Sequence, residues 1–360
     1  MKNNYAVIMA GGIGSRFWPI SRTTYPKQFI DILGTGKTLI QQTYERFLKI
    51  VPAENIYVVT NDSYRSLVKE QIPDMPYEQI LGEPVMRNTA PCIAYACHKI
   101  GMLNPEACIV VSPADHLILD TGAFVKDINF SMESASRNNC LITLGIKPSR
   151  PDTGYGYIQF TSHILEGELH KVKTFTEKPN LELARTFVQS GEFLWNAGIF
   201  VWSVSSILSA FDQYLPEMNE IFKEGDKRFN TPEEQPFIQN AYYQCTNISI
   251  DYGIMEKASN VYVLPTDFGW SDLGTWASVY ELSEKDYVGN AVSHSEKVIM
   301  YDSSNCMVNV PKDKLVVLQG LDDYIVVEAN NTLLICQKGK EQSVKQIVAD
   351  VKSRFGADYI

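Results

Sequence analysis

Residues 10–29 read A-G-G-I-G-S-R-F-W-P-I-S-R-T-T-Y-P-K-Q-F, and this stretch decides how the chain folds. It follows a short apolar run, residues 5–9, which predicts a buried first strand. Glycine residues near its start allow positive φ and a close approach of the backbone to a ligand, at Gly11, Gly12 and Gly14. Successive N–H groups in such a turn form a concavity suited to anions. With Arg16, Arg22 and Lys27 close by, the stretch predicts a phosphate site, a plain glycine turn with a solvated basic edge being the alternative.

Composition restricts the partners of the chain. Its 360 residues are enough for a substantial core and two domains, the second small. A formal net charge of −10 argues against nucleic-acid or membrane binding, because both need a basic surface. A nucleotide recognised here is therefore expected to be a small molecule in a locally basic pocket.

The N-terminus and the cysteines indicate a cytoplasmic protein. The first apolar run is too short for a signal peptide and leads directly into the glycine loop. No stretch reaches the length of a membrane span. The cysteine count is odd, seven, with no C-x-x-C pair, which favours buried free thiols over disulfides or zinc.

Apolar runs alternate with helical patterns through the first 286 residues. The runs at 55–60, 79–81 and 108–112 read as buried strands, each separated from the next by a helix. This alternation predicts an α/β fold, with a doubly wound, parallel sheet flanked by helices. Ligands in such sheets bind beyond the carboxyl ends of the strands, where the loops after Met9, Leu81 and Val111 fall.

Two carboxylates follow strands near the predicted phosphate site. Asp115 comes just after the run at 108–112, and Asp272 follows an apolar strand and a glycine. A lone carboxylate would repel a nucleotide, so both are expected to hold Mg²⁺, which takes one or two carboxylates plus phosphate oxygens. The alternative is that each caps a helix.

A second group of polar residues suits a sugar. The turn at 152–158 is rich in glycine and tyrosine, and the strands at 175–179 and 195–200 carry Glu, Lys and Asn. Glu and Asn can each accept two hydrogen bonds from vicinal hydroxyls, and a lysine can hold a sugar phosphate. The alternatives are an ordinary hairpin and surface charge. The predicted residues are Tyr155, Gly156, Glu177, Lys178 and Asn196.

Composition shifts after about residue 286. Short β-rich runs follow at 298–301, 315–318, 324–328 and 333–336, with turns between them. Their spacing suggests stacked coils closed by a helix at 343–354. We therefore expect a catalytic domain at 1–286 and a small β domain at 287–360, which is structural or oligomerising because it contains no chemical constellation.

These motifs together resemble the sugar-nucleotidylyltransferase family and, within it, the mannose-1-phosphate guanylyltransferases. The resemblance runs nearly end to end. It rests on eight motifs in order: G-G-x-G-S-R-F-W-P with P-K-Q-F (11–29), E-P-V-M-R-N-T-A-P (83–91), P-A-D-H (113–116), G-Y-G-Y-I (154–158), F-T-E-K-P (175–179), W-N-A-G-I-F (195–200), S-I-D-Y-G-I-M-E (249–256) and W-S-D-L-G-T-W (270–276).

The resemblance assigns roles to these positions. It implies a Rossmann-like, mixed but mostly parallel sheet of the glycosyltransferase-A type, followed by a short left-handed β-helix. The implied catalytic residues are Arg16, Lys27, Asp115 and Asp272, the last two as metal ligands. The implied nucleotide-binding residues are Gly11, Gly12, Gly14, Ser15, Arg16, Lys27, Glu83, Arg87 and Asn88. Guanine needs an acceptor on the protein, and Glu83, Asn88 and a backbone carbonyl all remain possible.

The implied reaction joins GTP and mannose 1-phosphate, with Mg²⁺, to give GDP-mannose and pyrophosphate. A homodimer is also expected. Two alternatives remain: a hexose-1-phosphate enzyme that uses UTP or dTTP, and a non-catalytic regulatory subunit that senses a sugar nucleotide. Many members continue into an isomerase domain, and because this chain stops at Ile360 we expect no isomerase activity.

Overall fold

The computed structural model describes residues 2–360. The chain forms two compact units, and each is assembled from separate segments. Unit 1 contains residues up to Gly11, 43–114 and 118–270, whereas unit 2 contains 12–42, 115–117 and 271–360. The boundary expected at residue 286 therefore stays a prediction.

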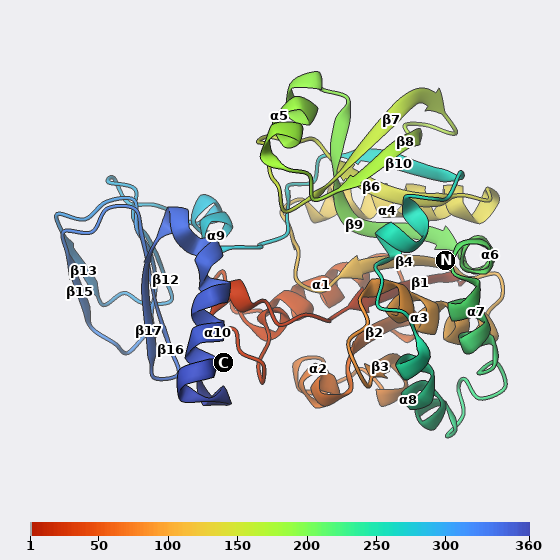
Figure 1. Cartoon of the computed structure of the whole chain (residues 1–360), viewed down its shortest axis with the longest axis horizontal. Coiled ribbons are helices and arrows are strands. Elements are labelled where there is room, and N and C mark those ends of the chain that lie inside the picture. The colour runs from red at the N-terminus through yellow and green to blue at the C-terminus, as the bar shows by residue number, and fades with distance from the viewer. Residues whose placement is uncertain (1) are drawn as a thin grey trace. The chain divides into compact units, whose positions relative to one another are not determined.

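Unit 1 is built on a nine-stranded sheet with the order β3-β2-β1-β4-β9-β6-β10-β8-β7 (Figure 1). Strands β3, β2, β1 and β4 are parallel, as are β6 and β10, and β9 runs antiparallel to β4 and β6. This confirms the predicted mixed, Rossmann-like sheet. The strands are β1 (Asn4–Met9), β2 (Ile56–Asn61), β3 (Ile80–Glu83), β4 (Cys108–Pro113), β6 (Leu141–Ile146), β7 (Gly156–Ile164), β8 (His170–Glu177), β9 (Phe193–Ser203) and β10 (Val261–Thr266).

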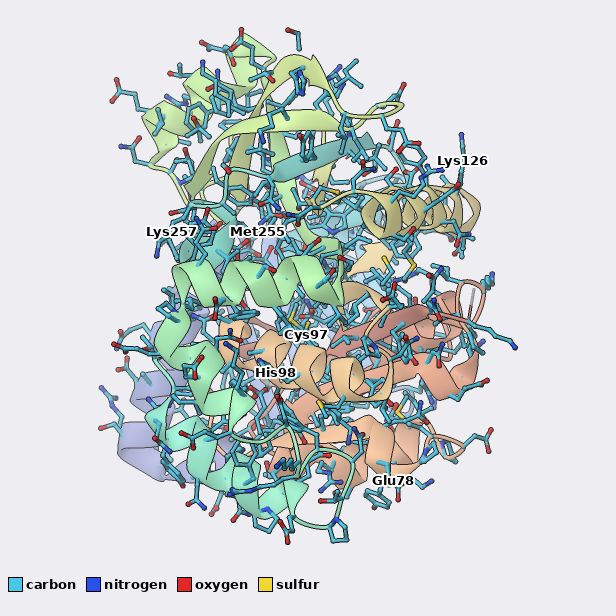
Figure 2. The ribbon with its side chains drawn as sticks, turned by 90° about the vertical axis from the view of Figure 1, so that its right-hand side faces the viewer. Glu78, Cys97, His98, Lys126, Met255 and Lys257 are labelled. Carbon is cyan, nitrogen blue, oxygen red and sulfur yellow. The ribbon has the colours of Figure 1, made fainter. Side chains whose placement is uncertain are left out.

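Helices cover this sheet because their apolar faces must be buried. Helix α3 begins where the Asn88 side chain accepts a hydrogen bond from the Thr89 N–H, and α4 begins at Asp120, which caps the Ala123 N–H. Figure 2 looks onto α3, which carries the labelled Cys97 and His98 and packs against α6. The helices are α1 (Leu39–Phe47), α2 (Arg65–Gln71), α3 (Thr89–Leu103), α4 (Thr121–Arg137), α5 (Leu181–Ser190), α6 (Val204–Tyr214), α7 (Pro216–Lys223) and α8 (Glu234–Gln244).

Unit 2 contains the predicted stacked coils. Strands β12 (Ala291–Ser293), β14 (Met307–Asn309) and β16 (Tyr324–Ala329) pair in parallel, and so do β13 (Val298–Tyr301) and β15 (Val316–Gln319). Strand β17 (Thr332–Gln337) adds antiparallel to β16. The sequence pattern missed β12 and β14, since a three-residue strand is too short to show alternation.

Two helices complete unit 2, namely α9 (Trp276–Leu282) and α10 (Val344–Phe355). Residues of the glycine-loop segment pack onto these C-terminal elements. The Phe17 and Trp276 rings meet edge to face at 5.2 Å, and Trp18 is buried with Leu334 and Val344. The segment 12–42 and the C-terminal part of the chain therefore share one core.

Two-residue strands, β5 (Leu117–Ile118) and β11 (Trp270–Ser271), lie where the chain passes from one unit to the other. The predicted buried thiols are confirmed for six of the seven cysteines, and all seven are free. Within residues 2–360, no helix is both long and apolar enough to traverse a bilayer.

A core substitution tests the packing of α4 on unit 1. Phe124 is fully buried and meets the rings of Phe47 and Phe268 at 5.8 and 5.3 Å. We expect Phe124→Ala to lower the free energy of unfolding by about 3–5 kcal/mol, because it removes buried apolar area and leaves a cavity. Urea unfolding measures this loss. Tyr287, 98% exposed, gives the control Tyr287→Ala, and equal losses in both variants would contradict the packing described.

Candidate active site

A cavity of about 280 Å³ in unit 2 gathers the phosphate and metal candidates. Its walls come from the glycine loop, the P-K-Q-F segment, the residues that follow β4 and β11, and α10. The cavity therefore brings together six of the residues that the motifs predict. The lining residues are Gly14, Ser15, Arg16, Phe17, Lys27, Asp115, His116, Asp272, Gly274 and Lys345.

Gly14 and Lys27 depend on each other. Gly14 has φ of 70°, and a Cβ built on it would lie 2.5 Å from the Lys27 Cβ. The Lys27 N–H also donates to the Ile13 carbonyl at 3.3 Å. A glycine is needed at 14 both for the left-handed backbone and for this close approach.

Lys27 is the central charge of the cavity. It is only 4% exposed, and its Nζ donates to Asp115 Oδ2 at 3.0 Å and to the Asp272 carbonyl at 2.7 Å. The ammonium also lies 5.4 Å from the centre of the Phe17 ring. One buried cation thus joins the two segments that carry the candidate metal carboxylates.

The charge state of Asp115 follows from this contact. Burial alone would raise the pKa of Asp115, but the Lys27 ammonium, and to a lesser extent His116, outweigh burial and hold the pKa below its ordinary value. The carboxylate is therefore ionised at neutral pH. Its contribution to stability is present above the ordinary carboxyl range and is lost as the pH falls through the lowered pKa.

Neither carboxylate caps a helix, so the capping alternative is wrong. Asp115 accepts from Lys27, and Asp272 Oδ1 accepts from the Gly274 N–H at 3.0 Å, while α9 is capped by Thr275. Residues 2–360 contain no group of three or more His, Cys, Asp or Glu that could hold a metal. Two carboxylates facing one cavity still fit Mg²⁺, since that ion commonly takes one or two carboxylates and completes its shell with phosphate oxygens and water.

The two arginines of the glycine loop differ from each other in role. Arg16 lines the cavity, although its Nε donates to Gln342 Oε1 at 3.0 Å. Arg22 lies away from the cavity lining and donates to the carbonyls of Asp358 and Asn330, both at 3.0 Å. The sequence placed Arg22 in the phosphate cradle, whereas its hydrogen bonds make it an anchor for the C-terminal segment.

The motif at 83–91 lies in unit 1. Glu83 is 5% exposed, and its Oε1 has no hydrogen-bond partner among residues 2–360. Burial raises the pKa of Glu83 to about 7, and Tyr242 offsets part of the rise. Asn88 is exposed with φ of 66°, and Arg87 is partly buried. Which residue reads the base stays a prediction, as do the roles of Gly11 and Gly12, which are outside the cavity lining.

The predicted sugar residues do cluster, again within unit 1. The Tyr155 ring contacts Trp195 and Trp270 at 5.0 and 5.2 Å. A Cβ at Gly156 would lie 2.3 Å from Glu177 Oε2, so the glycine makes room for that carboxylate. The Lys178 ammonium lies 3.1 Å from Glu177 Oε1.

Asn196 has a fixed orientation, and this involves a residue that the sequence analysis missed. Its Oδ1 accepts from Thr143 Oγ1 and from the Gly198 N–H, both at 3.1 Å, and its Nδ2 donates to Asp251 Oδ1 at 2.8 Å. Burial, and then the nearby Glu177, raise the pKa of Asp251 to about 6. The motif S-I-D-Y-G signalled Asp251 without indicating a role.

The segment that carries Asp251 is not an ordinary α-helix. Residues Asp251–Met255 form a single π-helical turn. Such turns are rare and frequent at functional sites. Lys345 was missed for another reason, because it lies in the C-terminal region, far in sequence from every motif.

Comparisons with known proteins show the family of the chain. A family model described as "Nucleotidyl transferase" matches residues 5–288, and one described as "MannoseP isomerase/GMP-like beta-helix domain" matches residues 296–351. The chain therefore belongs to the nucleotidyl transferase family. Members of this family generally use a divalent metal, with which the carboxylate pair agrees.

Individual relatives narrow the resemblance. A mannose-1-phosphate guanylyltransferase of Escherichia coli K12 is 37% identical over 97% of this chain and 73% of its own. One of Salmonella montevideo is 36% identical over 96% of this chain and 73% of its own. A crystal structure titled "mannose-1-phosphate geranyltransferase", from Thermus thermophilus, is 30% identical with a TM-score of 0.86, covering 97% of this chain and 99% of that one. The predicted resemblance to the mannose-1-phosphate guanylyltransferases is confirmed.

The raised pKa of Glu83 predicts that the stability of the protein depends on pH. With a pKa of about 7 when folded and an ordinary value of 4.5 when unfolded, Glu83 holds a proton between these values only in the folded state. Its contribution to stability therefore falls as the pH rises through this window. Glu83→Gln, which does not titrate, should gain about 2–3 kcal/mol over the natural chain between pH 5 and pH 8.

Chemical unfolding at several pH values measures this difference. Glu78→Gln provides a matched control, because Glu78 is exposed and belongs to the same part of the chain (Figure 2). A difference between Glu83→Gln and the natural chain that stays flat from pH 5 to pH 8 would show that Glu83 is not held protonated.

Proposed function

We propose that the chain transfers GMP from GTP to α-D-mannose 1-phosphate, giving GDP-mannose and pyrophosphate. The observation that carries this is the single cavity that holds the glycine loop, Arg16, Lys27 and the carboxylates of Asp115 and Asp272. The names of the relatives supply the substrates.

The chemistry is an in-line displacement at phosphorus. An oxygen of the sugar phosphate forms a bond to the α-phosphorus, the bond to the β-phosphate oxygen breaks, and pyrophosphate leaves with the electron pair. The attacking oxygen is already ionised at neutral pH, so no general base is needed. The protein contributes alignment and neutralisation of charge, for which Arg16 and Lys27 are the candidates.

A divalent ion, which we propose to be Mg²⁺, belongs to this scheme. Asp115 and Asp272 would hold it, and it would neutralise negative charge on the phosphate oxygens. Lys27 keeps the Asp115 carboxylate ionised and in place, which is the state that a metal ligand requires.

We propose that Asn196 and Glu177 recognise hydroxyl groups of the sugar in opposite ways, one as a hydrogen-bond donor and the other as an acceptor. Both acceptor directions of Asn196 Oδ1 are used by Thr143 and Gly198, and one Nδ2 hydrogen is used by Asp251. Asn196 can then offer a sugar only its second N–H, whereas Glu177 offers acceptors. The aromatic group around Tyr155 supplies an apolar surface beside them.

We propose roles for further residues as well. Glu83, Arg87 and Asn88 would lie beside guanine, with Asn88 favoured as the reader because it is exposed while Glu83 is buried. Gly11 and Gly12 would lie along the triphosphate, and Lys178 would hold the sugar phosphate. We also propose that the protein is cytoplasmic and forms a homodimer. Its domain boundary would lie at residue 286, and it would bind neither nucleic acid nor membranes.

The two alternative functions, an enzyme for another nucleotide and a non-catalytic regulatory subunit, would differ from this proposal in their site residues. An enzyme for another hexose 1-phosphate would share the cavity and differ in base and sugar recognition. A regulatory subunit without activity would have lost reactive groups, yet Arg16, Lys27, Asp115 and Asp272 all line the cavity. This set favours the enzyme.

A substrate panel tests the proposal. Purified protein with Mg²⁺ is given GTP, ATP, UTP, CTP or dTTP together with mannose 1-phosphate or glucose 1-phosphate, and pyrophosphate release is measured. We expect GTP with mannose 1-phosphate to be the best pair. A preference for UTP or dTTP would contradict the assignment of the substrates, and no release with any pair would contradict the reaction.

Variants test the roles of the central ion pair. We expect Asp115→Asn and Lys27→Ala each to lower turnover roughly a hundredfold or more, by analogy with the loss of an oxyanion donor. Asp313→Asn and Lys312→Ala are exposed controls in the same unit. Circular dichroism verifies that each variant is folded, and near-normal turnover in a folded variant would remove its assigned role.

A further inference from the structure

The last helix of the chain takes part in the candidate active site. Lys345, in the first turn of α10, lines the same cavity as Gly14, Lys27, Asp115 and Asp272. The sequence gives the C-terminal β domain no chemical role, so a cation from its closing helix at this place is unexpected.

The elements around α10 also hold the glycine loop in position. Gln342, just before the helix, accepts from Arg16 Nε at 3.0 Å. Trp18 packs with Leu334 and Val344, and its Nε1 donates to the Tyr359 carbonyl at 2.6 Å. The loop that forms one wall of the cavity is thus fixed to the C-terminal part of unit 2, and Lys345 is presented from a support shared with that loop.

The charges around the cavity indicate the kind of ligand that Lys345 would bind. The lining carries three cationic side chains and two carboxylates, namely Arg16, Lys27 and Lys345 against Asp115 and Asp272. Lys27 already donates to Asp115 and to the Asp272 carbonyl, and Arg16 uses its Nε on Gln342. With Lys345, the cations of the lining outnumber its carboxylates by three to two, so the lining carries a net positive charge, which suits a polyanionic ligand.

We propose that Lys345 binds the triphosphate of the nucleotide, so that the C-terminal β domain is part of the nucleotide site. This inference rests on the proposed function for the identity of the nucleotide, but not for its charge. Lys345 is exposed, so placing its charge at the cavity carries little cost of burial.

The test compares Lys345→Met with the natural full-length chain. We expect the KM for GTP to rise about tenfold or more, as for the loss of one hydrogen bond to a charged group. The KM for mannose 1-phosphate should stay within about twofold, because a phosphate-binding lysine on the nucleotide side acts on one substrate only. Lys345→Arg keeps the charge and should restore most of the affinity for GTP.

Lys352→Met is the matched control, since Lys352 is an exposed lysine two turns further along α10 and outside the cavity lining. Equal KM values for GTP in Lys345→Met and Lys352→Met would overturn the proposal. So would a parallel rise in the KM of both substrates, which indicates a general disturbance of the site.

Direct binding separates this inference from the proposed function. Calorimetric titration with GTP and Mg²⁺ is performed on the natural chain and on Lys345→Met, and it needs no turnover. If the natural chain binds GTP about tenfold more tightly but releases no pyrophosphate, the function fails and the role of Lys345 holds. If the panel selects another nucleoside triphosphate, that one replaces GTP, and equal binding by both proteins overturns the role of Lys345.

Discussion

The ion pair between Lys27 and Asp115 is the interaction on which the candidate active site depends. The ammonium and the carboxylate lie 3.0 Å apart, and Lys27 is 4% exposed. Removal of one partner leaves the other charge without compensation, which costs about 3–5 kcal/mol for a fully buried pair and less here, because Asp115 is 31% exposed. The pair fixes the segment after β4 to the glycine loop, and through the Asp272 carbonyl it also fixes the second carboxylate. The phosphate and metal recognition that we propose would thus be built around one lysine.

The parts of this arrangement that have a local sequence signal were predictable. Gly14 belongs to a glycine-rich turn and lies where the Lys27 side chain approaches the backbone, Asp115 follows a buried strand, and the alternation of strands and helices indicated the sheet. Hydrogen bonds between distant segments were not predictable. The sequence alone could not show that Arg22 is used on the carbonyls of Asn330 and Asp358, or that Glu83 is buried. The π-helical turn at Asp251 was not indicated by its sequence either.

The C-terminal β domain contacts the glycine-loop segment, which the sequence did not indicate. Its stacked strands are held by a small core, and they support α9 and α10, which pack against the glycine-loop segment. Trp18 illustrates the consequence, because a residue of the most recognisable motif is buried among side chains from β17 and α10. A motif that looks like part of a ligand site can therefore be conformational support for it, and a domain without motifs can supply part of the site.

We infer from this geometry that Lys27 and Asp115 act as one unit. A double-mutant cycle on kcat/KM with Lys27→Met, Asp115→Asn and the double variant tests this claim directly, with folding verified by circular dichroism. If the residues act together, the double variant should lose about as much activity as the worse single variant, since residues of one unit are strongly non-additive. A loss in the double variant equal to the product of the two single losses would show that Lys27 and Asp115 act independently, and would contradict the account.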